Sequence, residues 1–310
     1  MSNIMFSLVI PAYNYGMYIR DTIESIQAQS FTDWECIIIN DGSDDNTDDI
    51  VRQCIVNDSR FRYISQDNAG LVAVRNKGIM LARGEYIVIV DADDILREHH
   101  LHILFDCIRE SQADVAYVNT QWWWEFPTYC EFSPSPFRMP ESSGHIDSGT
   151  MYRRLLFDST QMTMHSAAFR KDSAIACGLF VENKGAGYED NEFWIRMARY
   201  GCTFYYQQRE YALYRQHDTS IVHSKKMFLE GRLTEIDILR KQFDPRFISQ
   251  EELSERIAEI YRSVLRDLLR AKEYSHAKIV CSKYFTETAK YSLGGIIRVL
   301  LFRMRIVFHL

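Results

Sequence analysis

Glycine and proline are scarce in this chain of 310 residues, which has only 14 glycines and 6 prolines. Collagen-like and linker-rich proteins need many of both, so the composition excludes those classes. Positive charge is not in excess either, because the formal net charge is -6 at pH 7. Proteins whose main partner is nucleic acid usually carry a basic face, and we therefore expect no nucleic-acid partner.

Cysteines are few and never closely paired. The seven lie at positions 36, 54, 107, 130, 177, 202 and 281, and none forms a CxxC pair. We expect buried, reduced thiols and hence a reducing, cytoplasmic compartment. The first residues lack a basic segment followed by a long apolar one, so no signal peptide is expected. The sequence also lacks a run of about 20 apolar residues, the length that spans a bilayer.

The first third of the chain alternates between short apolar runs and helical patterns. The apolar, β-branched runs are Phe6–Ile10, Cys36–Ile39, Phe61–Ile64, Tyr86–Val90 and Asp114–Val118. The helical patterns between them are Met17–Gln29, Thr47–Val56, Leu71–Ala82 and Leu101–Ser111. This alternation predicts an α/β fold with a doubly wound, mainly parallel sheet that is flanked by helices.

The remainder of the chain is less regular, and its patterns suggest a domain division. We expect a loop over Phe132–Gly144, and extended segments near Thr203–Tyr206 and Tyr211–Tyr214. Beyond Ser224 the pattern is almost wholly helical. These patterns predict a catalytic domain over residues 1–222 and a helical C-terminal annex over residues 223–310. Within the catalytic domain, we expect a nucleotide-binding part over about 1–120 and an acceptor part over about 121–222.

Polar residues follow three of the predicted strands. The three segments are Pro11-Ala12-Tyr13-Asn14, Asn40-Asp41-Gly42-Ser43 and Asp91-Ala92-Asp93-Asp94. A doubly wound sheet binds its ligands outside the carboxyl ends of its strands. The sequence therefore predicts that these segments meet at one edge of the sheet, where a ligand binds.

The triplet Asp91-Ala92-Asp93 carries the most chemistry. Two carboxylates one residue apart, just past a buried strand, suit a hard divalent cation and a nucleotide. Such a cation would neutralise charge on a departing diphosphate. Taken alone, such a triplet is more often a solvated turn or the cap of the next helix than a metal site.

Several ordered segments together resemble the inverting glycosyltransferase family 2, which has the GT-A fold. They are Val9–Asn14, Ile39–Ser43, Ala69–Gly78 and Ala82–Ile87, and the last of them leads directly into the acidic triplet. The resemblance is close over residues 6–120 and looser to about residue 220. It implies transfer of a hexosyl or N-acetylhexosaminyl group from a nucleotide-sugar donor, with Mn²⁺ or Mg²⁺ as cofactor.

The resemblance implies donor-binding roles for residues in these segments. Pro11, Ala12 and Tyr13 match the segment that lies against the base of the donor. Asp41 matches the carboxylate that hydrogen-bonds the base, commonly uracil, and Arg75 matches a basic residue near the nucleotide. A UDP-linked donor is therefore expected, with dTDP-linked and GDP-linked donors left open. Packing for Tyr13 and a surface ion pair for Arg75 are the alternatives.

Within the triplet, Asp91 matches a residue that contacts ribose or a metal-bound water, Ala92 a position beside the donor, and Asp93 the direct metal ligand. His217 lies in a segment that resembles the family's Y-R-x-H-x-x-S motif, and its imidazole could bind Mn²⁺. Arg215 of the same segment suits a phosphate group. A structural role for His217 is the alternative.

Glu189 and Asp190 match the acidic pair that supplies the catalytic base. Asp190 is the first candidate and Glu189 the second. An inverting transfer needs a carboxylate that takes the proton of the attacking hydroxyl. In isolation, the same acids would simply be favourable at a helix N-terminus.

The acceptor side is less defined by the sequence. A glycan or lipid-linked saccharide at the inner face of the membrane is the acceptor that the resemblance implies, in surface polysaccharide synthesis. Trp122–Trp124 could form an acceptor platform, pack internally or bind a partner. The apolar tail at residues 293–310 could lie on an anionic membrane as a peripheral contact, or dock on protein.

Two other functions remain as alternatives. One is a non-catalytic nucleotide-sugar-binding or scaffold protein. The other is a sugar nucleotidyltransferase, which would need a Gly-rich, basic loop in place of the segment that begins at Pro11. A dinucleotide-dependent dehydrogenase is excluded, because no G-x-G-x-x-G motif follows the first predicted strand.

Overall fold

The computed structural model describes residues 4–126, 129–134, 139–157, 162–182, 188–217 and 225–288. The chain forms two compact units. The first consists of Met1–Glu182 and Glu189–Ser220, and the second of Asn183–Tyr188 and Ile221–Leu310. The functional divisions at residues 120 and 222 stay predictions.

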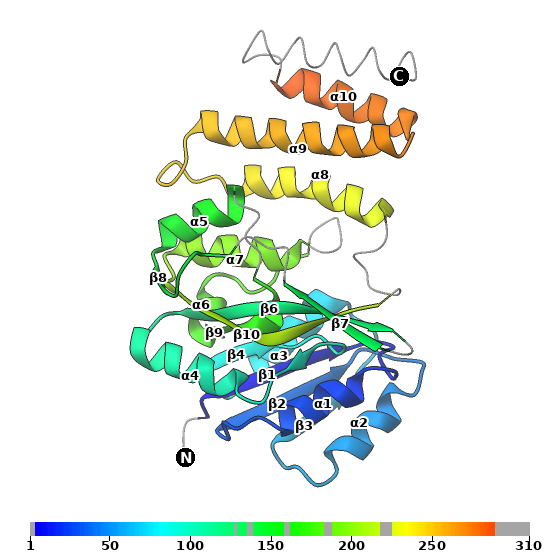
Figure 1. The fold of residues 1–310 in the computed structure, drawn as a ribbon, viewed down its shortest axis with the longest axis vertical. Helices are drawn as coiled ribbons and strands as arrows, with labels where there is room; N and C mark the ends of the chain where they lie inside the picture. Colours follow the sequence, from blue (N-terminus) through cyan, green and yellow to red (C-terminus); the bar gives the residue numbers. More distant parts are fainter. Residues whose placement is uncertain are drawn as a thin grey trace. The chain divides into compact units, whose positions relative to one another are not determined.

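Four parallel strands form the first half of the sheet (Figure 1). Their order is β3-β2-β1-β4, and they are β1 (Phe6–Ala12), β2 (Trp34–Asn40), β3 (Phe61–Ser65) and β4 (Tyr86–Ile89). Every residue of β1, β2 and β4 is buried. Strands covered on both faces need apolar side chains in both directions, which explains the continuous apolar runs of the sequence.

Helices cover this half of the sheet. They are α1 (Ile19–Gln27), α2 (Thr47–Ile55) and α3 (Leu71–Leu81). Apolar residues of α1 pack into one core with Leu8 and Ile10 of β1. Val9 points the other way and lies against α3, where a Cβ atom added to Gly78 would be 2.2 Å from a Val9 methyl carbon. Successive residues of β1 thus face different helices, as the side-chain alternation of a strand requires.

The second half of the sheet is mixed. It consists of β5 (Ile95–Leu96), β6 (Val115–Phe126), β7 (Tyr129–Pro134), β8 (Gly144–Ile146), β9 (Ala167–Arg170) and β10 (Phe204–Gln216). Strands β6 and β10 are parallel, whereas β9 joins the two halves by pairing antiparallel with both β4 and β6. The elements around them are α4 (His100–Ser111), α5 (Ser148–Phe157), η1 (Met164–Ser166), α6 (Lys171–Ala176) and α7 (Glu189–Tyr200). The predicted α/β architecture is confirmed.

The prediction of a loop over Phe132–Gly144 is wrong for its first residues, which belong to a strand. Strand β6 continues through the tryptophans to Phe126, and β7 pairs with it antiparallel as far as Pro134. Aromatic side chains favour strands when they find cross-strand partners, and Trp122 lies opposite Tyr214 of β10. The two extended segments expected between residues 203 and 214 are one strand, β10, whose register shifts between Gln207 and Ala212.

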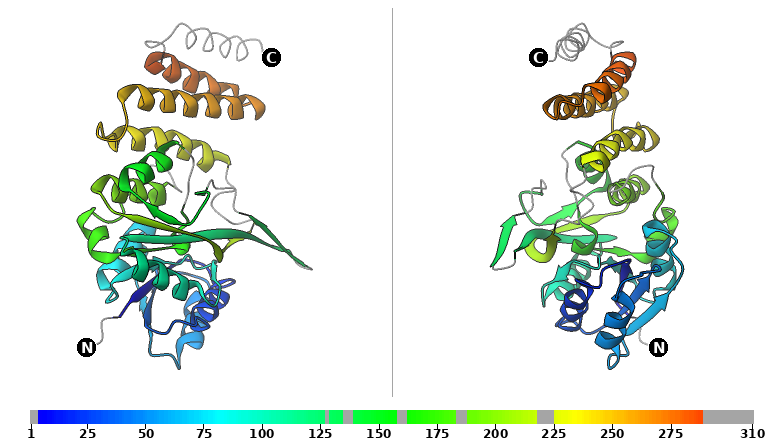
Figure 2. Two further views of the ribbon diagram at one scale, coloured as in Figure 1. Left: turned by 60° about the vertical axis from the view of Figure 1, so that its left-hand side comes forward. Right: turned by 90° about the vertical axis from the view of Figure 1, so that its right-hand side faces the viewer.

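The second unit is helical in its described part. It contains α8 (Lys225–Lys241), α9 (Gln250–Arg270) and α10 (Tyr274–Thr288), which lie side by side with α9 in the middle (Figure 2). A capping box at the start of α9 satisfies backbone N–H groups, since the Ser249 hydroxyl accepts from the Glu252 N–H and the Glu252 carboxylate from the Ser249 N–H. The predicted α/β fold with a helical C-terminal annex is thus observed.

Membrane contact remains a prediction. Among the described helices, none is both long and apolar enough to cross a membrane. The tail at residues 293–310, for which an interfacial helix was one expectation, lies outside the described residues. Location at the inner face of a membrane likewise stays a prediction.

Candidate active site

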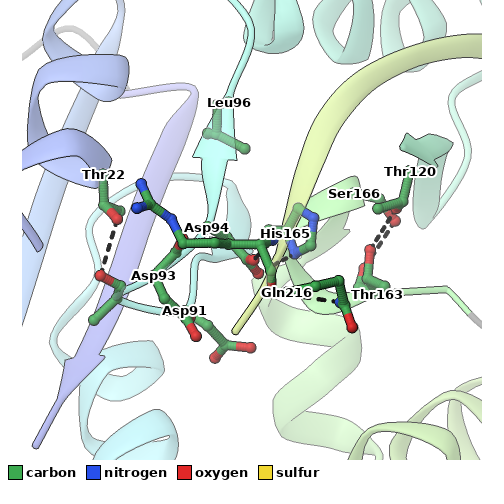
Figure 3. Close-up of polar contacts among 12 residues, drawn as sticks. Thr22, Asp91, Asp93, Asp94, Leu96, Thr120, Thr163, His165, Ser166 and Gln216 are labelled. Atoms are coloured by element: carbon green, nitrogen blue, oxygen red, sulfur yellow. Dashed lines mark hydrogen bonds and ion pairs between the residues drawn. The ribbon is translucent and has the colours of Figure 1, made fainter. Parts of the chain in front are cut away.

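The acidic triplet forms a turn directly after β4. The Asp94 N–H donates to the Asp91 carbonyl oxygen at 3.1 Å, which closes the turn. The Thr22 hydroxyl of α1 donates to the Ala92 carbonyl oxygen at 3.0 Å (Figure 3). Ala92 itself is buried, so its small side chain lets the turn pack against the sheet. The two flanking carboxylates, Asp91 and Asp93, are thereby held at the edge where the sequence predicted a ligand.

Asp93 and His217 lie together although 124 residues separate them in the sequence. The distance between His217 Nε2 and Asp93 Oδ2 is 2.9 Å. The imidazole stacks on the Tyr18 ring, with centroids 4.5 Å apart and planes 24° apart. Stacking fixes the ring orientation, so that Nε2 faces the carboxylate. Two of the three predicted metal ligands are therefore neighbours.

Arg75 connects the acidic triplet with the residues predicted to supply the catalytic base. Its guanidinium is only 2% exposed and lies 3.1 Å from Asp91 Oδ1, 2.5 Å from Asp190 Oδ1 and 3.4 Å from Glu189 Oε1. Burial opposes the charge on Arg75, but the three carboxylates outweigh it and raise its pKa. The predicted nucleotide-contacting residue thus makes its contacts here with three protein carboxylates.

Asp190 occupies the first turn of α7, next to Glu189. Desolvation raises the pKa of Asp190 to about 7, with the neighbouring charges of Glu189 and Asp91 adding to the shift and Arg75 opposing it. Its side chain remains 32% exposed. A carboxylate that titrates near neutral pH and can still reach a ligand has the properties of a general base.

The residues that are predicted to bind the nucleotide base of the donor lie at the carboxyl ends of β1 and β2. Pro11 and Ala12 are the last two residues of β1, and the Asp41 N–H donates to the Ala12 carbonyl oxygen at 2.8 Å. Tyr13 follows with 48% of its surface exposed, so its ring is free to meet a ligand. Gly42, next to Asp41, adopts a positive φ of 78°, which a side chain would disfavour.

Asp41 itself organises the loop that precedes α3. Its Oδ1 accepts from the Gln66 side-chain amide at 2.7 Å and from the Ala69 N–H at 2.9 Å, and its Oδ2 accepts from the Gly70 N–H at 2.9 Å. The two oxygens of a carboxylate can accept about four hydrogen bonds, so Asp41 can accept one more, from an N–H of the nucleotide base. The recognition of a base by Asp41 stays a prediction that this geometry allows.

Sequence reasoning missed a buried pair beneath the triplet. Asp94 and His165 are both at most 1% exposed, and His165 Nδ1 lies 2.6 Å from Asp94 Oδ2. Burial raises the pKa of Asp94 to about 7 against the attraction of His165, whereas the nearby carboxylate outweighs burial and raises the pKa of His165. Nothing in the sequence spacing links position 94 with position 165, so only the fold could reveal this pair.

Arg215 supports the triplet in this structure. Its Nε donates to the Asp93 carbonyl oxygen at 3.0 Å, and its backbone N–H donates to Asp94 Oδ1 at 3.1 Å. The guanidinium pairs with Asp21 at 2.6 Å and lies over the Trp123 ring, 4.2 Å from its centroid. These contacts bury it, so they favour a role in holding the acidic turn over the suggested phosphate contact.

The side chains at this site fit a divalent cation whose coordination is completed by phosphate oxygens. In the part of the chain that the structure describes, no three His, Cys, Asp or Glu residues are grouped so that they could hold a metal ion by themselves. Mg²⁺ and Mn²⁺ commonly bind one or two protein ligands and complete their coordination with phosphate oxygens and water. Asp93 and His217 would supply such protein ligands, while Asp91, the third predicted ligand, pairs with Arg75 at 3.1 Å and stays 33% exposed.

Comparison with known proteins identifies the family. The model of "Glycosyl transferase family 2" matches residues 7–179, more than half of the chain. Glycosyltransferase GlyG of Streptococcus pneumoniae serotype 4 is 40% identical over 116 residues, which are 37% of this chain and 38% of GlyG. Chondroitin synthase of Escherichia coli is 39% identical over 106 residues, 34% of this chain and 16% of that protein. The matched segments thus span well under half of these relatives.

A solved structure shares the fold. It is that of S. aureus TarS 1-349 in complex with UDP-GlcNAc, with a TM-score of 0.64 and 18% sequence identity over 83% of this chain and 71% of that chain. At this identity the likeness shows the fold, and it agrees with the GT-A type of sheet. The family match runs from β1 through β9 and includes the acidic triplet, and the chain therefore belongs to glycosyl transferase family 2.

Proposed function

We propose that this protein transfers a sugar from a UDP-linked donor to a hydroxyl group of a glycan or lipid-linked saccharide, with inversion, in polysaccharide biosynthesis. The observation that carries the proposal is the Arg75 ion-pair cluster. It brings Asp190, a carboxylate with a pKa of about 7, next to Asp91 of the acidic turn. A direct displacement needs a general base close to the edge of the sheet at which the sugar donor binds.

In this proposal, Asp190 accepts the proton of the acceptor hydroxyl while that oxygen bonds to the anomeric carbon. The bond from this carbon to the diphosphate oxygen breaks on the opposite side, so the anomeric centre inverts. Arg75 orients Asp190 through the 2.5 Å contact, and Glu189 shares the same guanidinium. One displacement needs no covalent enzyme intermediate.

The donor side of the proposal rests on the edge formed by β1, β2 and the acidic turn. Tyr13 would lie against the base, and Asp41 would accept a hydrogen bond from it. A divalent cation held by Asp93 and His217 would neutralise the charge that develops on the leaving diphosphate. TarS, whose structure contains UDP-GlcNAc, supports the choice of a UDP-linked donor. Chondroitin synthase, a relative by sequence, supports a polysaccharide product.

Thermal unfolding with nucleotides tests the donor side. The protein is heated with UDP, dTDP, GDP or CMP, each with Mn²⁺ or with EDTA. A ligand at 100 times its dissociation constant adds about 2.7 kcal/mol of stability, which raises the midpoint by several degrees. We expect a Mn²⁺-dependent shift with UDP that Asp93→Asn abolishes. Asp49→Asn, which alters an exposed carboxylate of α2, serves as the matched control and should keep the shift.

The absence of a shift with every nucleotide, in folded protein, would contradict the proposal and favour a scaffold protein. A shift with GDP or dTDP alone would correct the donor and leave the transfer reaction standing.

A further inference from the structure

One face of the β6–β10 pair carries aromatic and amide side chains. Residues two apart on a strand point to the same side, so Trp122 and Trp124 of β6 share a face. In the parallel register Trp122 pairs with Tyr214 and Trp124 with Gln216. These four residues therefore form one surface, which we call the aromatic face.

The rings of the aromatic face contact one another. The Trp122 and Tyr214 centroids are 6.1 Å apart with planes at 77°, and the Trp122 and Trp124 centroids are 6.0 Å apart with planes at 58°. All three residues are partly exposed. The opposite face of the same strands is occupied differently, because Trp123 lies against Arg215 and stacks on Phe132. The aromatic face is thus separate from the contacts that hold the acidic turn.

The aromatic face borders the candidate active site. The Tyr214 ring lies 5.9 Å from the His165 ring, which contacts Asp94 of the acidic turn. Burial raises the pKa of Tyr214, and the charges of four carboxylates, including that of Asp190, raise it further. Tyr214 is therefore within electrostatic reach of both the acidic turn and the proposed base.

Gln216 adds a polar group to this face. The residue is only 2% exposed. Its Nε2 donates to the Arg215 carbonyl oxygen at 3.4 Å, whereas its Oε1 has no hydrogen-bond partner within the described parts of the chain. A buried acceptor without a donor is unfavourable, so a hydroxyl that donates to Oε1 would be bound favourably.

We propose that the aromatic face binds a pyranose ring of the acceptor, with Gln216 Oε1 accepting a hydrogen bond from one of its hydroxyl groups. This inference rests on the proposed function and names the acceptor class: a saccharide. The C–H groups on one side of a pyranose form an apolar patch that stacks on an aromatic ring, while its hydroxyls need polar partners. None of the four side chains is cationic, so the face does not suit a phosphate group as the part that it recognises.

Acceptor kinetics test the inference. Transfer from the nucleotide sugar that the protein hydrolyses is measured to glucose, galactose and N-acetylglucosamine oligosaccharides, and to a polyprenyl phosphate. We expect a saccharide to accept the sugar. Trp122→Ala and Trp124→Ala should raise its KM about tenfold or more, corresponding to about 1.4 kcal/mol. The donor KM and the slow hydrolysis of the donor by water should not change.

Three variants make the result specific. Trp124→Phe keeps an aromatic ring and should recover part of the acceptor affinity. Phe132→Ala removes an exposed ring from the opposite face of the same sheet and should leave the acceptor KM unchanged. Tyr214→Phe keeps the ring and should retain more affinity than Tyr214→Ala. Circular dichroism and the UDP-induced thermal shift establish that each variant folds and binds donor.

The outcomes separate this inference from the proposed function. Transfer only to the polyprenyl phosphate, hydrolysis without transfer to any saccharide, or an unchanged acceptor KM in both tryptophan variants would overturn the acceptor assignment and leave the donor site intact. Failure to bind any nucleotide or to hydrolyse any donor would instead refute the proposed function, and the acceptor assignment with it.

Discussion

Removal of the Arg75 guanidinium is the perturbation whose effect the structure defines best. Arg75→Met keeps most of the side-chain volume but leaves Asp91, Glu189 and Asp190 close together without a countercharge. Breaking a buried ion pair by removing one partner costs about 3–5 kcal/mol. Asp91 and Asp190 are 33% and 32% exposed, so water screens part of their repulsion. We therefore expect a loss at the lower end, about 3 kcal/mol.

Thermal unfolding measures this loss. For a domain of this size, about 3 kcal/mol lowers the midpoint by roughly 6–12 °C. A double-mutant cycle with Asp190→Asn should show coupling, because neutralising one carboxylate relieves part of the repulsion in Arg75→Met. The matched control is Arg52→Met, which removes a surface arginine that pairs with Asp48 and is 61% exposed. The control should barely move the midpoint.

A small midpoint change in Arg75→Met, equal to that of Arg52→Met, would refute the reasoning. Strict additivity of Arg75→Met and Asp190→Asn would also refute it. Either result would mean that the cluster contributes no interaction energy, and that Asp190 is positioned by other contacts.

Two further predictions follow from the pKa of the base and from helix packing. Since the protonated form of Asp190 cannot accept a proton, kcat/KM should fall as the pH drops through about 7; a profile that stays flat down to pH 5 would exclude Asp190 as the base. Gly78→Ala would place a Cβ atom 2.2 Å from Val9, so overpacking should destabilise the protein by about 1–3 kcal/mol in chemical unfolding. Without a clash, replacing a helical glycine by alanine is stabilising, and Ala73→Gly on the same helix measures the size of that backbone effect; an unchanged or higher stability of Gly78→Ala would argue against the close approach of α3 to β1.

The sequence predicted the parallel half of the fold well, because its strands are buried on both faces. Their continuous apolar runs and the polar segments after them fix both the strands and the edge at which they end. The pairing of β6 with β7 was not predicted, because aromatic residues such as Trp123 suit a loop surface, an interface or a strand equally. Only the presence of partners such as Phe132 decides between them.

For the site, the sequence supplied candidate residues but not their contacts. Asp93 and His217 were both proposed as metal ligands, and the fold places them 2.9 Å apart. The pairing of Arg75 with Asp190 was not foreseen, since a basic residue on a helix gives no sign of which carboxylates will surround it. Asp94 and His165 were missed for the same reason, because a buried polar pair is defined by three-dimensional packing.

The most direct test of the account is sugar transfer by the wild-type protein and by Asp190→Asn, using the donor whose nucleotide binds with Mn²⁺. The variant should bind this nucleotide as the wild type does, because the donor edge is unchanged. Its transfer rate should fall by about a hundredfold or more, as expected when a general base is removed. A variant that transfers sugar at the wild-type rate would contradict the role of Asp190, and a wild-type protein that binds donor but transfers nothing would contradict the proposed reaction.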